Sequence, residues 1–91
     1  MKVTPFARRV YRATASIPLG QVRTYKWVAA KAGNPKAVRA VGQILKRNPF
    51  PLLIPCHRVV RSDGDIGGYA RGRRAKAVLL DLEQAIRKNM V

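Results

Sequence analysis

The sequence predicts a small, mainly α-helical domain, and three observations support this fold class. A chain of 91 residues has room for one hydrophobic core, and its 47% apolar content is enough to build one. Apolar residues recur at helical spacing in several segments, and glycines and prolines separate these segments. No continuous apolar stretch approaches the roughly 20 residues that cross a bilayer. We therefore expect a single domain over residues 1–91 and no membrane span.

The first helix is expected from Thr4 to about Ser16. Thr4 is a favoured N-cap residue, and Pro5 suits the first helical turn because its φ angle is already helical. One face carries apolar residues at helical spacing: Phe6, Ala7, Val10, Tyr11 and Ala13. Residues 17–20, Ile-Pro-Leu-Gly, then break the helix and turn the chain.

A pair of helices is expected next. Thr24 is a second N-cap candidate and predicts a short helix over residues 25–32. Residues 33–35, Gly-Asn-Pro, end this helix and open a third one over residues 36–46, because glycine tolerates the left-handed conformation and proline suits a first helical turn. Two helices joined by a tight turn that contains glycine form a helix-turn-helix pattern, whose second helix usually docks on DNA.

The third helix has two contrasting faces. The side chains expected to face the core are Val38, Val41, Ile44 and Leu45. Those left for phosphates or bases are Lys36, Arg39, Gln43, Lys46 and Arg47. Short helix pairs are also common in bundles that bind no DNA, so a purely structural role is the alternative.

A stiff loop and a short extended segment follow. Prolines at 49 and 51 exclude a helix there and direct the chain into the apolar residues 52–54. Val59 and Val60 are expected to be extended, and residues 61–64 have the composition of a turn. The glycines at 67 and 68 would let a ligand approach the backbone closely.

The last helix is expected over residues 73–89. Its apolar face, the side that normally packs on a core, holds Val78, Leu79, Leu82, Ala85 and Ile86. Its opposite face holds Lys76, Arg87 and Lys88.

The charge balance indicates a polyanionic partner. The chain has 19 Lys and Arg against 4 Asp and Glu, which gives a formal net charge of +15 and an isoelectric point near 11.6. These cations alternate with apolar residues instead of forming the block of a basic tail, so the pattern is that of a folded domain that binds nucleic acid. Solubility at high positive charge, or adaptation to heat or salt, is the alternative explanation.

Cys56 is the only cysteine and lies in the run Ile-Pro-Cys-His-Arg-Val-Val of residues 54–60. One Cys and one His are too few for a Cys/His zinc site, so no metal site is expected. Cationic neighbours, His57 and Arg58 among them, favour a reactive thiolate over a buried structural cysteine, which is the alternative. In an extended backbone the two side chains would point to opposite sides, so we expect His57 to act on Cys56 through a water molecule. From the last helix, Asp81 or Glu83 could reach back to the histidine.

These residues resemble the active-site segment of the O6-alkylguanine-DNA alkyltransferases, the methylated-DNA–protein-cysteine methyltransferases. The resemblance is carried by residues 54–60, 62–64 and 67–69. Residues 33–42 and the Asn48-Pro49 pair are similar to that family's helix-turn-helix and asparagine hinge. The resemblance runs from about Thr4 to Glu83 and implies a winged-helix-like domain with a short extended active-site segment. Most members carry an N-terminal domain before this one, whereas here the first helix begins almost at Met1, so we expect that domain to be absent.

The resemblance implies DNA repair by a protein that acts once. Cys56 would take the alkyl group from O6-alkylguanine in duplex DNA and keep it as a thioether. His57 would draw the thiol proton through a water, and Glu83 would orient His57. Asn48 would brace the hinge between the helix pair and the active-site loop, and Tyr25 would hydrogen-bond a guanine ring nitrogen.

The resemblance also implies how DNA is held. The helix that contains Lys36, Ala37 and Gln43 would lie against the minor groove, and Arg39 would take the place of a flipped nucleotide, which must leave the stack to react. The residues implied to form the substrate pocket are Tyr25, Val59, Gly67, Gly68, Tyr69 and Ala70. No cofactor and no metal is implied, and a monomer is expected.

Two other functions stay open. One is an alkyltransferase-like damage sensor that binds alkylated guanine without accepting the group, although such proteins typically have tryptophan at the position of Cys56. The other is a general basic helix-turn-helix DNA-binding protein with an incidental thiol. The first six residues lack a secretory signal, so an intracellular, cytoplasmic and nucleoid-associated location is expected. Trp27 stands where the family often has a small or polar residue, and the sequence gives no account of it beyond added contact.

Overall fold

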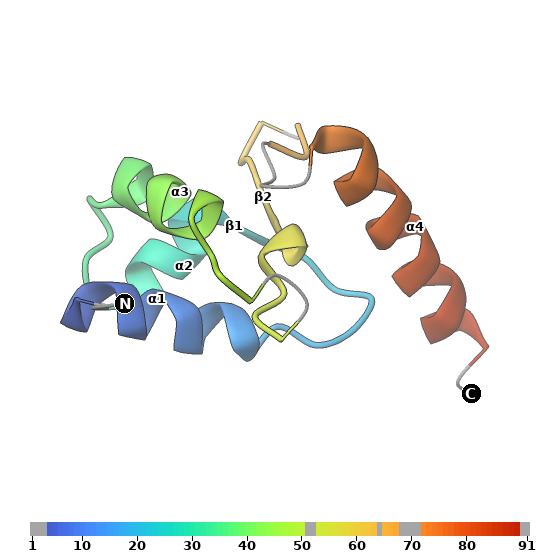
Figure 1. The fold of residues 1–91 in the computed structure, drawn as a ribbon, viewed down its shortest axis with the longest axis horizontal. Coiled ribbons are helices and arrows are strands. Elements are labelled where there is room, and N and C mark those ends of the chain that lie inside the picture. The colour runs from blue at the N-terminus through green and yellow to red at the C-terminus, as the bar shows by residue number, and fades with distance from the viewer. Residues whose placement is uncertain (1–3, 51–52, 64, 68–71, 90–91) are drawn as a thin grey trace.

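The computed structural model describes residues 4–50, 53–63, 65–67 and 72–89, and it confirms a mainly helical domain. Its elements in chain order are α1 (Pro5–Ala15), β1 (Arg23–Thr24), α2 (Tyr25–Lys31), α3 (Val38–Lys46), the 3₁₀ turn η1 (Cys56–Arg58), β2 (Val59–Val60) and α4 (Arg73–Lys88). Helices α1, α2 and α3 cluster together, and α4 lies on the other side of η1 and β2 (Figure 1). Within the described residues, no helix has both the length and the apolar character needed to cross a membrane.

Helix α1 begins where its cap predicts. The Thr4 Oγ1 accepts a hydrogen bond from the Ala7 N–H at 3.1 Å, and Pro5 occupies the first helical turn. Val10 and Ala13 are buried in the core, and the Tyr11 hydroxyl donates to the Ile44 carbonyl of α3 at 3.3 Å. The predicted first helix is therefore confirmed in its extent and in its packed face.

The core lies where the three helices meet the segment around Cys56. Its buried members come from α1, α2, α3, η1, β2 and the residues just after α1 and α2: Val10, Ala13, Ile17, Val28, Ala29, Ala32, Val41, Leu45, Cys56 and Val59. Cys56 is therefore part of the hydrophobic core and is positioned by it.

A short parallel sheet joins two distant segments. In the register of β1 and β2, Arg23 pairs with Val59 and Thr24 with Val60. The extended state of β2 is confirmed, whereas the pairing with β1 is not visible from sequence because two residues carry no periodicity. Thr24 also caps α2, since its Oγ1 accepts from the Trp27 N–H at 3.0 Å. The sheet therefore fixes the start of α2 beside the segment that carries Cys56.

The turn between α2 and α3 is longer than predicted. Gly33 has φ +94° and closes α2, as expected. The third helix begins at Val38, two residues later than predicted, because Asn34 builds a turn of its own. Its carbonyl accepts from the Ala37 N–H at 3.0 Å and its Oδ1 from the Lys36 N–H at 3.3 Å. Lys36 thus lies in the turn and not in the helix.

The core-facing role predicted for Val38 is wrong. Val38 is 37% exposed, and the buried residues of α3 are Val41 and Leu45. Val38 lies in the first turn of the helix, one turn before the packed stretch begins, and it lines an open cavity instead.

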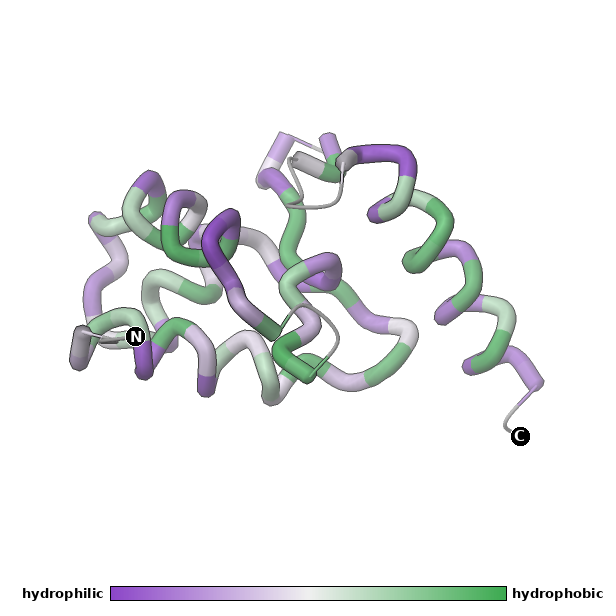
Figure 2. The backbone as a smooth tube through the Cα atoms, in the orientation of Figure 1, coloured by the Kyte–Doolittle hydropathy of each residue, from purple (hydrophilic) through white to green (hydrophobic). Residues whose placement is uncertain are grey.

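The apolar face predicted for α4 is buried only in part, since Leu79 packs against the core while other members are exposed. Its hydrophobic stretch, visible in Figure 2, includes Val78 and Leu82, which are 61% and 53% exposed, while Lys76 and Glu83 are buried. Lys76 donates to the Val59 carbonyl of β2, and Glu83 accepts hydrogen bonds from His57 and Arg58 of η1. Ala75 and Leu79 also pack against the core. An amphipathic pattern marks two faces, and here specific polar contacts decide which of them is buried.

Candidate active site

Cys56 is the first residue of the η1 turn and lies on the wall of a cavity. The residue is 4% exposed and lies on the wall of a cavity of about 440 Å³, together with Tyr25, Leu45 and Gly67. Residues 56–58 form a 3₁₀ turn, so the extended backbone predicted for the Cys-His pair is wrong. The turn follows Pro55, and the Arg58 N–H donates to the Pro55 carbonyl at 2.9 Å.

Burial raises the pKa of the Cys56 thiol above its usual value. Opposing this, the Asn48 side chain hydrogen-bonds to Cys56, the Lys76 charge acts on it, and the backbone N–H groups of Cys56 and His57 also lower its pKa. The site therefore holds the cysteine protonated at rest and surrounds it with groups that stabilise the thiolate once the proton leaves.

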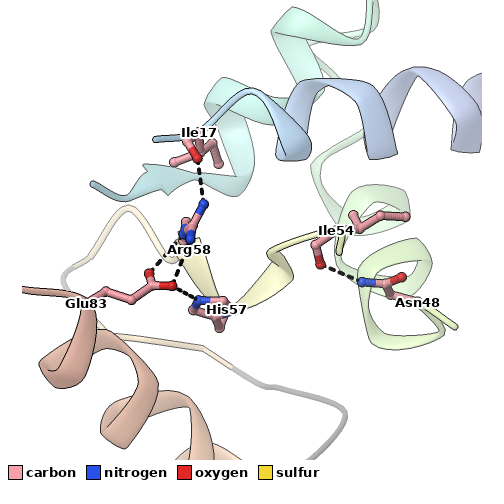
Figure 3. Close-up of polar contacts among 6 residues, drawn as sticks. All are labelled: Ile17, Asn48, Ile54, His57, Arg58 and Glu83. Carbon is pink, nitrogen blue, oxygen red and sulfur yellow. Dashed lines mark hydrogen bonds and ion pairs between the residues drawn. The ribbon is translucent and has the colours of Figure 1, made fainter. Parts of the chain in front are cut away.

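His57 is held by Glu83 (Figure 3). The His57 ring is buried, and its Nε2 lies 2.8 Å from Glu83 Oε2. An ionised carboxylate only accepts hydrogen bonds, so Nε2 carries the proton and Nδ1 is the basic nitrogen of the neutral ring. The carboxylate thereby selects the tautomer that could take a proton on the other edge of the ring.

Arg58 anchors the same carboxylate. Its Nε donates to Glu83 Oε1 at 2.9 Å and its Nη2 to Oε2 at 2.8 Å, a bidentate pair. Its Nη1 donates to the Ile17 carbonyl at 2.9 Å, beyond the end of α1 (Figure 3). Burial raises the pKa of the Glu83 carboxyl, but hydrogen bonds from Arg58 and His57 outweigh it and hold the pKa below its usual value. Glu83 is therefore ionised at neutral pH.

Asn48 uses both ends of its amide to shape the loop before Cys56. Its Nδ2 donates to the Ile54 carbonyl and its Oδ1 accepts from the Phe50 N–H, each at 2.9 Å. Together with its hydrogen bond to Cys56, these contacts place a buried Asn48 between the end of α3 and the active-site segment, where a brace was predicted.

Lys76 is a buried cation that the sequence reading missed. Its exposure is 0%, and its Nζ donates to the Val59 carbonyl at 2.6 Å and lies 3.5 Å from the Tyr25 hydroxyl. Burial lowers its pKa from 10.5 to about 8, while the charge of Cys56 acts in the opposite direction. Lys76 is seven residues before Glu83, two helical turns along the same face, so the spacing could have revealed it once Glu83 was placed beside His57.

The cavity needs glycine at position 67. Gly67 has φ +78°, and a Cβ atom built on it would lie 3.0 Å from the Tyr25 hydroxyl. Val59, predicted in the pocket, has its side chain buried in the core, and its carbonyl accepts a hydrogen bond from Lys76. Gly68, Tyr69 and Ala70 lie outside the described residues.

The predicted DNA-contacting residues line a second cavity of about 840 Å³. Lys36, Arg39 and Gln43 lie on its wall, and Tyr25 is shared with the first cavity. Ala37, also predicted, is the half-buried N-cap residue of α3. The cavity beside the helix pair therefore adjoins the cavity of Cys56. In the part of the chain that the structure describes, no cluster of His, Cys, Asp and Glu could hold a metal ion.

A family model described as "6-O-methylguanine DNA methyltransferase, DNA binding domain" matches residues 5–85. The chain belongs to this family. The resemblance stated from the cysteine segment is thus confirmed for 6-O-methylguanine DNA methyltransferases.

Curated relatives are named methylated-DNA–protein-cysteine methyltransferases. The chain is 49% identical over 81 residues to the methylated-DNA–protein-cysteine methyltransferase of Methanosarcina barkeri, covering 89% of this chain and 51% of that protein. It is 48% identical over 84 residues to the constitutive enzyme of Bacillus subtilis, covering 91% and 51%. The chain therefore spans about half the length of the 6-O-methylguanine DNA methyltransferases that it matches.

Solved structures show the same fold. The chain superposes on Mycobacterium tuberculosis OGT in complex with DNA with a TM-score of 0.89 and 40% identity, covering 92% of this chain and 52% of that one. It also superposes on S. pombe Atl1 in complex with damaged DNA containing O6-carboxymethylguanine, with a TM-score of 0.80 and 34% identity, covering 91% and 79%. The helix pair and the cysteine segment thus have the architecture of the family's DNA-binding domain.

Proposed function

We propose that this domain repairs alkylated duplex DNA by transferring the alkyl group of O6-alkylguanine to Cys56. The observation that carries the proposal is the position of Cys56: it opens into a cavity that adjoins the helix-turn-helix surface and is flanked by a histidine fixed on a buried carboxylate. The Sγ–carbon bond forms as the carbon–O6 bond breaks, and the bonding electron pair leaves with guanine. A thioether is a stable bond that water does not hydrolyse, so each molecule acts once.

Thiol activation uses the two sides of the His57 ring. Nε2 is committed to Glu83, so Nδ1 takes the proton of Cys56 through a water molecule. Arg58 keeps the carboxylate ionised and in place. Lys76 adds a positive charge that favours the thiolate, which offsets part of the effect of burial.

Tyr25 and Lys76 serve the leaving group. The Tyr25 hydroxyl lies on the cavity wall, where it donates to a ring nitrogen of guanine and stabilises the charge that guanine gains. The Lys76 ammonium, 3.5 Å from that hydroxyl, polarises it as a donor. Gly67 lies on the cavity wall against which the base would rest.

The DNA is held by α3 and the turn before it. A guanine inside the stack cannot present O6 to the thiol, so the nucleotide is flipped out at a cost of a few kcal/mol. Arg39 fills the space it leaves, while Lys36, Ala37 and Gln43 lie along the minor groove. No cofactor takes part, and the protein acts as a monomer on the DNA of the nucleoid.

A damage sensor is the second candidate. The likeness to Atl1, solved in complex with damaged DNA containing O6-carboxymethylguanine, supports it. A cysteine inside the cavity favours transfer.

Intact mass after incubation with a duplex that holds one O6-methylguanine separates the candidates. Transfer adds one methyl group, located on Cys56 by peptide mapping, and Cys56→Ala abolishes the gain while it keeps DNA affinity. An unchanged mass with preferential binding of the damaged duplex identifies a sensor. Unchanged mass with no preference identifies a general DNA-binding domain.

A further inference from the structure

The charges of this chain are unevenly distributed. All four carboxylates lie between residues 63 and 83, whereas residues 1–62 hold 13 of the 19 lysines and arginines and no acidic residue. The described ion pairs involve only His57, Arg58, Arg61 and Arg73 among the basic residues. The basic side chains of α1 and α2 therefore have no ion-pair partner among the described residues. They form a positive surface in addition to that of α3.

Three of these cations converge on one groove. Arg9 and Arg12 of α1 and Lys31 at the end of α2 line a cavity of about 220 Å³ together with Ala13 and Ser16. We call this the α1–α2 groove. None of its residues lines the cavity of Cys56 or the cavity beside α3.

The groove is partly preorganised for an anion. The Arg9 Nε donates to the Ala32 carbonyl at 2.8 Å, and its guanidinium lies 5.6 Å from the centre of the Phe6 ring. The Lys31 Nζ lies 6.0 Å from the centre of the Trp27 ring. These contacts restrain two cationic side chains, so less conformational entropy is lost when a phosphate binds. They also give Trp27 a role that the sequence does not explain.

The α1–α2 groove opens away from the DNA-facing helix. Tyr11 lies on the side of α1 that contacts α3, because its hydroxyl donates to the Ile44 carbonyl. Successive residues of a helix are about 100° apart, so Arg12 lies about 100° and Arg9 about 160° around α1 from Tyr11. Figure 2 shows hydrophilic segments of α1 on the edge that is turned away from α3. A duplex held by α3 therefore leaves the groove exposed.

We propose that the α1–α2 groove binds the phosphate backbone of a second DNA segment while α3 holds the first. This inference rests on the DNA binding in the proposed function. A regular row of phosphates fits a groove with two arginines and one lysine, and backbone contacts need no particular sequence. A second site lets the protein pass directly between segments, which shortens the search for a rare damaged base.

The test is the dissociation rate from a fluorescent undamaged duplex, measured at rising concentrations of unlabelled duplex. Direct transfer makes this rate rise with competitor concentration, whereas release into solution makes it independent of the competitor. The rate should rise for the unmodified protein and lose this dependence in Arg12→Ala/Lys31→Ala. The two side chains are exposed and make no hydrogen bond among the described residues, so the variant is expected to fold.

Arg74→Ala/Lys88→Ala is the matched control. It also removes two positive charges from exposed positions, at the two ends of α4, and should keep the competitor dependence. Equal loss in both variants, or a rate independent of competitor in the unmodified protein, overturns the proposal. The proposal is also overturned if the groove binds an acidic protein or an anionic vesicle but does not bind a second duplex.

Methyl transfer to Cys56 from a short damaged duplex is measured in the same variants. Unchanged transfer in Arg12→Ala/Lys31→Ala supports a groove separate from the active site, and a loss of transfer there overturns it. If no protein transfers a methyl group, the proposed repair function fails, while the competitor dependence still decides the second DNA site.

Discussion

The His57 ring and the Glu83 carboxylate lie 26 positions apart in sequence and 2.8 Å apart in space. Their contact is the point at which α4 meets the cysteine-bearing turn, so one interaction orients the proposed base and attaches the last helix. Arg58 shares the same carboxylate. Replacing Glu83 therefore tests stability and activity at once.

Glu83→Ala should destabilise the domain by roughly 3–5 kcal/mol, because it leaves the partly buried Arg58 charge without its carboxylate. Urea unfolding followed by circular dichroism measures this loss. Asp81→Ala, two residues away on the exposed side of α4, is the control and should change stability by less than about 0.5 kcal/mol. Similar losses in the two variants would contradict a structural role for the network.

Removing Lys76 should shift the pH dependence of alkyl transfer. The Lys76 charge lowers the pKa of Cys56 against the effect of burial, so Lys76→Gln should raise that pKa further and move the rising limb of the rate to higher pH. Single-turnover rates between pH 6 and about 9.5 measure the shift. Arg74→Gln removes a charge from the same helix and should leave the profile in place; identical profiles for all three proteins would exclude a role for Lys76.

Gly67→Ala should slow alkyl transfer. Its Cβ would lie 3.0 Å from the Tyr25 hydroxyl, so Tyr25 must move to make room. Gly72→Ala is a sharp control, because Gly72 has φ +93° but no atom within 4 Å of the built Cβ. Both variants should lose roughly 1 kcal/mol of stability from backbone strain, and only Gly67→Ala should lose activity. An equal loss of activity would mean that strain, and not the contact with Tyr25, is responsible.

Arg39→Ala should reduce transfer from a flipped nucleotide more than it reduces affinity for undamaged duplex. An arginine that fills the stack acts only after flipping, whereas a phosphate contact acts on every duplex. Fluorescence of a base analogue beside the lesion reports flipping, and titration with undamaged duplex reports affinity. Lys46→Ala, at the other end of α3, gives the loss expected from a phosphate contact alone. If the two variants lose transfer and affinity in the same proportion, Arg39 is only a phosphate contact.

Local signals in the sequence predict much of this fold. Thr4 and Thr24 cap helices where their side chains indicate, because capping depends only on residues three positions away. Cys56 and His57 are recognisable from their run, and the family resemblance adds Glu83. The burial of Lys76 and the outward face of Val78 are not predictable locally, since both depend on which side of α4 bonds to a segment about 20 residues earlier. The 3₁₀ turn at Cys56 is likewise set by its packing in the core.

The pairing of β1 with β2 bears on how far this sequence can change. β1 leads directly into Tyr25, and β2 directly follows the turn that starts at Cys56. The two walls of the cavity are therefore spaced by hydrogen bonds between main chains, which every residue except proline can make. The side chains of Arg23 and Val60 are only half-buried, so substitutions at these positions can keep the same distance between tyrosine and cysteine.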